Sequence, residues 1–275
     1  MNNRDDTVVA GFGDEWTRFD QTGLPDAERK RWFEAYFAVF PWYRLDPTAV
    51  GFDLGCGSGR WAALVAPRVG RLLCVDASEA ALAVARRNLE HLDNCELIHA
   101  SVDGLPFADA SMDFGYSLGV LHHVPDTRAG IAACVRKLKP GAPFLVYLYY
   151  AFDNRPGWFR VAWKLSDLLR GVVSRAPHGV RYALSQALAA LLYWPLARGA
   201  RWLERRGFEV THLPLSAYRD SAFYVMRNDA LDRFGTRLER RFTRAEIETL
   251  LHEAGLRDVR VHDGVPFWCA AGIKQ

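Results

Sequence analysis

A glycine-rich loop is the first feature of the chain that indicates chemistry. Three glycines at alternate positions, Gly55, Gly57 and Gly59, follow a short apolar segment and precede a helical pattern. Glycine lets the backbone turn sharply and approach a ligand closely, so the loop predicts a binding site. The dinucleotide fingerprint would place its third glycine where this chain has Arg60, which disfavours a nicotinamide cofactor.

Three carboxylates stand at or just beyond the ends of predicted strands. Asp53 precedes the glycine loop, where a negative charge repels a pyrophosphate and suits a ligand with an ammonium group, as in S-adenosylmethionine. Asp76 can accept hydrogen bonds from both ribose hydroxyls, and Asp103 can accept from an adenine amino group. Open α/β sheets bind ligands at successive strand ends, so the set favours S-adenosylmethionine over unconnected roles in turns and caps.

Short apolar runs alternate with helical patterns from Val50 onward, which is typical of βαβ units in a parallel sheet. Thr243 and Glu246 form a capping box that opens a helix near the end of the chain, and Gly255 ends that helix. The pattern therefore predicts a doubly wound α/β core. The expected strands are 50–54, 71–75, 96–99, 112–118, 144–149, 259–262 and 267–273.

Four segments follow from this pattern. Residues 1–47 are rich in aromatics and are expected to form a helical cap, and residues 48–150 are expected to form the cofactor-binding core. Residues 151–241 are expected to form a helical insert, and residues 242–275 the closing helix and strands. The insert holds 16 Lys and Arg against 8 Asp and Glu, whereas the rest of the chain holds 19 against 24. A basic insert on an acidic core is expected to act as a lid and to bind the acceptor.

Several classes of protein are disfavoured. The five cysteines are scattered, without metal-ligand spacing, so we expect reduced thiols and no metal. The start of the chain lacks the apolar run of a signal peptide, which favours the cytoplasm. Segment 184–202 is too interrupted to span a bilayer, although it could touch a membrane surface, and no nucleic-acid-binding module is recognisable.

The chain resembles the class I S-adenosylmethionine-dependent methyltransferases over residues 48–150, especially the subgroup that includes the ubiquinone- and menaquinone-biosynthesis methyltransferases. The resemblance is carried by DLGCGSG, CVDAS, SVDGLPFADASMDFGYSLGVLHHV and VRKLKPGAPFLV. The closing segment RFTRAEIETLLHEAGLRDVRVHD is similar to the family's last helix and sixth strand. The resemblance as a whole implies a Rossmann-like, seven-stranded, mostly parallel sheet with one antiparallel edge strand, plus the helical insert.

The resemblance also implies a set of cofactor contacts, carried over position by position. Asp53, Gly55, Gly57 and Gly59 would line the methionine part, Asp76 with Ala77 the ribose, Asp103 with Gly104 the adenine, and Leu118 with His123 the sulfonium.

Methyl transfer to a hydroxyl or ammonium group also requires loss of a proton. His123, or its neighbour His122, follows the fourth predicted strand and could act as the general base, although such a histidine pair is as often a packing element. In the insert, tyrosines and arginines could hold an anionic acceptor by bidentate hydrogen bonds, or could lie on a solvated helix. The candidate acceptor contacts are Tyr149, Tyr218, Arg219, Tyr224 and Arg227.

The sequence therefore predicts an S-adenosylmethionine-dependent methyltransferase for a small or amphiphilic acceptor, with an anionic group as one option and oxygen slightly favoured over nitrogen or sulfur. Two alternatives remain open. One is another reaction of the sulfonium, such as aminocarboxypropyl transfer or cyclisation, and the other is a non-catalytic S-adenosylmethionine-binding regulator. We expect a monomer or homodimer, with a small-molecule or lipid-like partner.

Overall fold

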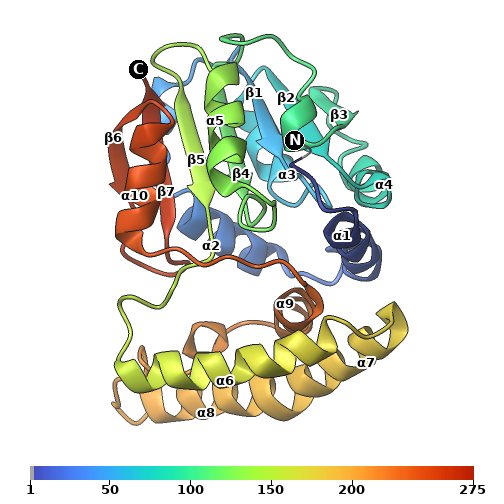
Figure 1. Ribbon diagram of the computed structural model, residues 1–275, viewed down its shortest axis with the longest axis vertical. Helices are drawn as coiled ribbons and strands as arrows, with labels where there is room; N and C mark the ends of the chain where they lie inside the picture. Colours follow the sequence, from blue (N-terminus) through green and yellow to red (C-terminus); the bar gives the residue numbers. More distant parts are fainter. Residues whose placement is uncertain (1–2) are drawn as a thin grey trace. The chain divides into compact units, whose positions relative to one another are not determined.

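The computed structural model describes residues 3–275 and contains two compact units (Figure 1). Of the described residues, the sheet unit consists of 3–20, Lys30–Ala151 and Leu238–Gln275. The helical unit consists of Gln21–Arg29 and Phe152–Arg237. Its boundaries differ from those of the expected insert, because residues from Leu238 return to the sheet unit and part of the N-terminal segment joins the helices. The roles expected of the four segments stay predictions.

A single seven-stranded sheet forms the centre of the sheet unit, in the order β3-β2-β1-β4-β5-β7-β6. β7 runs antiparallel to both β5 and β6, and the pairs among β1 to β5 are parallel. The predicted Rossmann-like fold is therefore confirmed, with the antiparallel strand second from the edge. The strands are β1 Val50–Leu54, β2 Arg71–Asp76, β3 Cys95–His99, β4 Phe114–Leu118, β5 Pro143–Tyr147, β6 Leu256–Val261 and β7 Cys269–Lys274.

The strand bounds differ from the expected ones mainly at three places. Met112 forms an isolated bridge with Leu138 instead of extending β4. β5 ends at Tyr147, so Tyr149 lies beyond the strand. β6 begins at Leu256, earlier than expected, because only Ala254 and Gly255 separate it from the preceding helix. The apolar pattern indicates which segments are buried, but burial alone does not determine which residues pair in the sheet.

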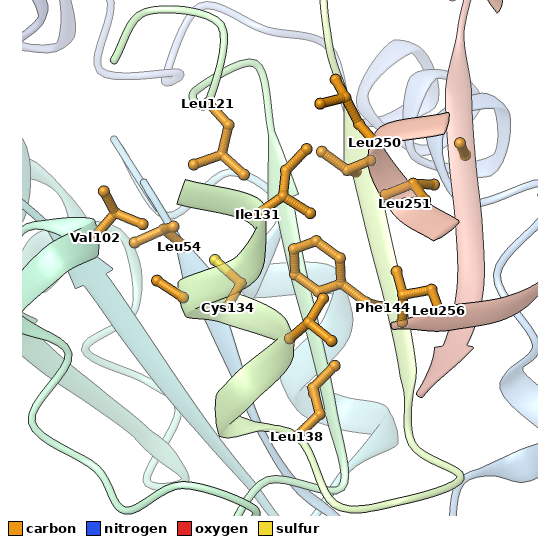
Figure 2. Close-up of a cluster of buried hydrophobic side chains, with 14 of the residues drawn as sticks. Leu54, Val102, Leu121, Ile131, Cys134, Leu138, Phe144, Leu250, Leu251 and Leu256 are labelled. Atoms are coloured by element: carbon orange, nitrogen blue, oxygen red, sulfur yellow. The ribbon is translucent and has the colours of Figure 1, made fainter. Parts of the chain in front are cut away.

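Helices cover both faces of the sheet. Helices α2, α3 and α4 contribute to a cluster on one face with residues such as Trp61, Leu72 and Tyr116, and α1 lies beside α4. Helices α5 and α10 cover the other face, where Ile131 and Leu251 pack on Phe144 (Figure 2). The helices are α1 Asp6–Arg18, α2 Asp26–Tyr36, α3 Ala62–Val65, α4 Glu79–Asn88, α5 Thr127–Lys137 and α10 Arg244–Glu253.

Side-chain caps begin several of these helices. Ser78 accepts a hydrogen bond from the Ala81 amide at the start of α4. Thr243 and Glu246 form the predicted capping box at the start of α10. These caps fix where α4 and α10 begin, and α4 in turn follows directly from the carboxyl end of β2.

The helical unit has its own small core. Tyr193, Ala197 and Val173 pack on Met226 and Phe234, which are fully or almost fully buried. A five-residue π-helical turn, Ala189–Tyr193, joins α7 to α8, so the two form one continuous helix with a wide turn. The helices of this unit are α6 Gly157–Val173, α7 His178–Leu188, α8 Trp194–Glu204 and α9 Phe223–Gly235.

Two glycines in neighbouring strands make room for aromatic rings. A Cβ atom on Gly51 would lie 2.3 Å from the ring of Phe114, and one on Gly115 would lie 2.4 Å from the ring of Phe52. Both rings are completely buried. The centre of the sheet therefore depends on a reciprocal fit of glycine to phenylalanine between β1 and β4.

We expect Gly115→Ala to lower the free energy of unfolding by about 1–3 kcal/mol, because the added methyl group overpacks a rigid core. The matched control is Gly104→Ala, where the new Cβ would meet only Ser101 Oγ at 3.8 Å and no left-handed conformation is required. Its effect should stay within about 0.5 kcal/mol. Urea unfolding of both variants checks this, and equal stabilities would show that the β1–β4 contact relaxes without cost.

Candidate functional site

A pocket lies at the carboxyl ends of the central strands, entirely within the sheet unit. Its walls include Gly55 after β1, Ala77 after β2, Ser101 after β3, and Gly119 after β4. The pocket encloses about 780 Å³ of space between atoms, part of it open to solvent. The strand order reverses between β1 and β4, which is where open α/β sheets bind ligands. The position and size suit a nucleoside-containing molecule.

The glycine loop and Asp76 form the polar end of this pocket. Gly55, Gly57 and Gly59 all have left-handed φ values, 75°, 55° and 77°, which glycine adopts without strain. Asp76 Oδ2 accepts a hydrogen bond from the Gly57 amide at 2.9 Å, and Oδ1 accepts one from the Ser78 amide at 2.8 Å. Each carboxylate oxygen keeps a further lone pair, so Asp76 can still accept from ligand hydroxyls.

Asp53 lies on the opposite side of β1 from Phe52 and Leu54, beside Tyr116 in the neighbouring strand. Burial raises the pKa of Asp53 to about 8, and the nearby Tyr116 hydroxyl offsets only part of that effect. The carboxyl group is therefore mostly neutral at pH 7 in the protein without ligand. The electrostatic reason for assigning Asp53 to an ammonium group does not hold in that state, and its contact with the cofactor stays a prediction.

The predicted adenine contacts lie beside the pocket. Among the described residues, the walls include Ser101 and Val102 but not Asp103, Gly104, Asp53, Gly57 or Gly59. Asp103 accepts hydrogen bonds from the Ser101 hydroxyl and from the Asn3 amide. These bonds hold the pKa of Asp103 below its usual range, with the Ser101 bond as the largest cause. The carboxylate thus fixes the N-terminal segment, and its role toward adenine stays a prediction.

The histidine pair divides into one pocket residue and one core residue. His123 lines the pocket together with Leu118, and its Nδ1 lies 2.6 Å from the Leu238 carbonyl oxygen. His122 is completely buried and stacks on Tyr149 at 3.9 Å between ring centroids. Burial lowers the pKa of His122 well below its usual range, with the charges of His123 and Arg241 as further causes, so this imidazole is neutral.

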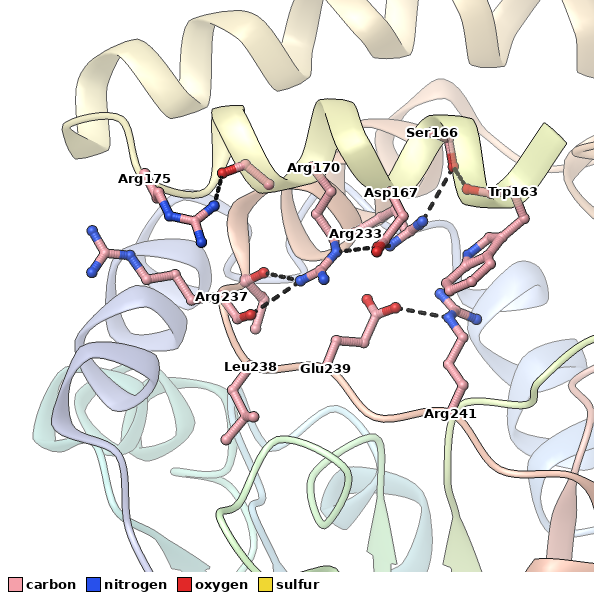
Figure 3. A network of polar contacts seen from close by, with 12 residues as sticks. Trp163, Ser166, Asp167, Arg170, Arg175, Arg233, Arg237, Leu238, Glu239 and Arg241 are labelled. Atoms are coloured by element: carbon pink, nitrogen blue, oxygen red, sulfur yellow. Dashed lines mark hydrogen bonds and ion pairs between the residues drawn. The ribbon is translucent and has the colours of Figure 1, made fainter. Parts of the chain in front are cut away.

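The candidate acceptor contacts outside the core have partners of their own. Tyr218 donates a hydrogen bond to Asp229 Oδ1 at 2.6 Å, and Arg219 pairs with Glu204 at 2.7 Å. The Tyr224 hydroxyl accepts from the Gln21 amide, and Arg227 binds Gln186 Oε1 and the Tyr182 hydroxyl. Tyr149, in the sheet unit, lies under the Arg241 guanidinium, which pairs with Glu239 (Figure 3). Their roles in acceptor binding stay predictions.

Helix α1 supplies pocket residues that the sequence indicated only as part of an aromatic-rich helical cap, without naming them as site contacts. Val8, Phe12 and Trp16 lie on the walls, as do Asn3, Arg4 and Asp5 before the helix and at its cap. A Cβ on Gly57 would lie 2.7 Å from the Trp16 ring, so this glycine also allows α1 to approach the loop. The available signal was the aromatic spacing of residues 12, 16 and 19, which marks one helix face without revealing its partner.

Comparison with known proteins agrees with this geometry. Residues 52–146 match the family model described as a methyltransferase domain. Over 134 residues, the chain is 33% identical to a protein of Mycolicibacterium smegmatis named as a probable S-adenosylmethionine-dependent methyltransferase. It is 31% identical over 164 residues to the ubiquinone biosynthesis O-methyltransferase of Hahella chejuensis. The matches cover 48% and 54% of this chain, and 50% and 67% of those relatives.

A solved structure shares the fold. A candidate methyltransferase from Bacillus halodurans aligns over 83% of this chain and 71% of its own, with a TM-score of 0.51 and 16% sequence identity. The chain belongs to the class I S-adenosylmethionine-dependent methyltransferases, a family of enzymes, and its cofactor is S-adenosylmethionine.

The pocket contains groups that fit this cofactor. Asp76 offers carboxylate lone pairs at the end of β2, where a ribose can present two hydroxyls. Gly119 has a left-handed φ of 80°, and no atom lies within 4 Å of where its Cβ would stand, so the wall is open there. Apolar side chains from β4 and α1 supply the remaining surface for an adenine ring and a methyl group.

We expect Asp76→Ala to weaken S-adenosylmethionine binding by at least about tenfold, because each charge-assisted hydrogen bond contributes about 1.5–3 kcal/mol. The control Asp109→Ala removes an exposed carboxylate that pairs with Lys137 outside the pocket. Calorimetric titration of both variants with S-adenosylmethionine measures the effect. A separate titration with NAD tests the other class of cofactor. Unchanged affinity in the Asp76 variant would remove this residue from the site.

We expect Asp53→Asn to change how stability depends on pH. The folded protein holds this proton up to about pH 8, whereas the unfolded chain releases it near its ordinary value of 3.8. The folded state therefore binds the extra proton, and its stability falls as pH rises between these values. In the parent, Asp53 should make the free energy of unfolding fall by about 1.4 kcal/mol per pH unit between pH 5 and 7, and the variant should lack this contribution. Parallel slopes in urea unfolding would show that Asp53 is ionised.

Proposed function

We propose that the chain transfers the methyl group of S-adenosylmethionine to a hydroxyl oxygen of a small amphiphilic acceptor with an apolar, lipid-like part. Two observations support this. The pocket wall near the end of β4 is mainly apolar, formed by Val8, Phe12, Leu118, Val120 and Val124. One relative is named as an O-methyltransferase of ubiquinone biosynthesis.

The position of His123 on the pocket wall is the observation on which the proposal mainly rests. This imidazole stands on the pocket wall just past β4, with its ring centroid 4.9 Å from that of Phe12. If Nδ1 donates its proton to the Leu238 carbonyl at 2.6 Å, Nε2 is the basic nitrogen. This tautomer is the one that a general base needs.

S-adenosylmethionine, when bound, supplies a methyl group already activated by its sulfonium. The chain must then hold the acceptor in line, keep water out and take up the acceptor's proton. We assign the last task to His123, since His122 is enclosed in the core and stacked on Tyr149. The apolar wall would hold the carbon skeleton of the acceptor, which gives its hydroxyl a fixed direction.

We expect His123→Gln to lower kcat, measured at saturating S-adenosylmethionine, by about 100-fold or more, because general-base catalysis contributes this much. The control is His91→Gln, an exposed histidine beyond α4. The assay offers alkyl-substituted phenols, carboxylates and amines in parallel and measures S-adenosylhomocysteine across pH. Equal kcat in the variant and the parent would remove His123 from catalysis.

The same assay separates the other reactions of the cofactor. Methyl transfer yields S-adenosylhomocysteine, whereas aminocarboxypropyl transfer yields methylthioadenosine. Turnover of the phenol with the first product supports our proposal. Turnover of the amine alone would contradict the choice of oxygen, and methylthioadenosine would contradict methyl transfer itself.

A further inference from the structure

Helix α6 has an inverted distribution of polarity. The face that packs inside the helical unit buries Val173 and also carries ion pairs. Asp167 pairs with Arg170 at 2.6 Å and with Arg233 of α9 at 3.6 Å, and Arg233 donates to Ser166 Oγ at 3.2 Å (Figure 3). The solvent face is apolar. Its exposed fractions are 52% for Trp158, 59% for Val161, 64% for Leu165, 71% for Leu168, 43% for Leu169 and 71% for Val172.

These exposed side chains form one continuous stripe. Positions 158, 161, 165, 168 and 172 are spaced by three or four residues, so they share a helix face for more than three turns. Scattered exposed apolar residues are normal, but a contiguous apolar surface marks an interaction site. The internal ion pairs fix which side of α6 faces outward, so the exposure of this stripe is built into the unit.

The continuous helix formed by α7 and α8 carries a second apolar stripe. Its inner side holds buried residues such as Tyr193 and Ala197, which pack with α9. Its outer side exposes large apolar side chains along its whole length. These are Val180, Leu184, Leu191, Leu192, Trp194, Leu196 and Trp202.

The charge around the two stripes is strongly positive. Residues 155–206 contain ten Lys and Arg but only two carboxylates, Asp167 and Glu204. Both carboxylates are already paired, with Arg170 and Arg219. Within residues 3–275, no ion pair is recorded for four exposed cations near the stripes. These are Arg160, Lys164, Arg205 and Arg206.

We propose that α6 and the α7–α8 helix lie in the interface of a lipid bilayer that contains anionic headgroups. An amphipathic helix with large apolar residues on one face and Lys or Arg beside them has the composition of interfacial helices. Tryptophans such as Trp158, Trp194 and Trp202 favour the headgroup level, and long basic side chains reach the phosphates from there. Along the described chain, no helix is long and apolar enough to cross the bilayer.

Charge complementarity favours this occupant over a second copy of the chain. A twofold contact would place the same face of each copy against the other, so cations such as Arg160 and Lys164 would meet a surface with the same excess of positive charge. An anionic lipid surface offers hydrocarbon for the stripes and phosphate for the cations at the same time. The proposal does not depend on the identity of the acceptor, and it concerns the helical unit alone.

Flotation of the purified full chain with vesicles tests the proposal. We expect binding to vesicles of phosphatidylcholine with phosphatidylglycerol, weaker binding to phosphatidylcholine alone, and a decrease with salt. The double variant Leu165→Glu with Leu168→Glu should lose more than about tenfold in partitioning, because both side chains lose their apolar contact. The control Tyr43→Glu adds one such charge at a residue 76% exposed in the sheet unit and should bind as the parent does.

A second variant separates charge from apolar contact. Arg160→Glu with Lys164→Glu should remove the preference for anionic vesicles. Absence of binding to either vesicle, or equal binding of the parent and the leucine variant, would overturn the proposal. So would a two-chain mass in solution that the leucine variant reduces to one chain, since that result identifies a dimer interface. S-adenosylmethionine binding, measured for each variant, reports separately on the pocket and on folding.

Discussion

The hydrogen bond from the Gly57 amide to the Asp76 carboxylate is the contact on which the site depends. It joins the loop after β1 to the end of β2, the two segments that form the polar end of the pocket. The bond requires a left-handed backbone at Gly57, and the absence of a side chain there also admits the Trp16 ring of α1. Gly57 thus sets the loop conformation and allows the N-terminal helix to approach the pocket, and together with the Ser78 amide it orients the carboxylate.

The central sheet could be predicted from the sequence because its signals are local. The apolar run at Val50–Leu54, the alternate glycines after it and the capping box at Thr243 each specify an element within a few residues. The positions of Gly55 and Asp76 on the pocket follow from the same rule, since parallel strands bring their carboxyl ends to one edge. No local signal of this kind predicted where α1 packs, because its aromatic face does not reveal which surface it covers.

The remaining differences arise from contacts between residues far apart in the chain. The place of Arg227 depends on Gln186, which lies 41 residues earlier in the chain. Asp53 looked like an available charge at a strand end, yet its surroundings of buried side chains from β2 and β4 keep it neutral. Composition identified a basic, aromatic helical segment correctly. Only the structure shows that the ion pairs of α6 lie inside and its leucines outside, the reverse of a usual surface helix.

The π-helical turn at Ala189–Tyr193 has a consequence for how this segment can vary among relatives. A π turn is an α-helix with one extra residue, so it sets the rotational phase of α8 relative to α7. Losing one residue there would rotate α8 by about 100° about its axis, since an α-helix has 3.6 residues per turn. Ala197 and Ala200 would then leave the packed side of the helix. This helix should therefore accept changes of side chain more readily than changes of length.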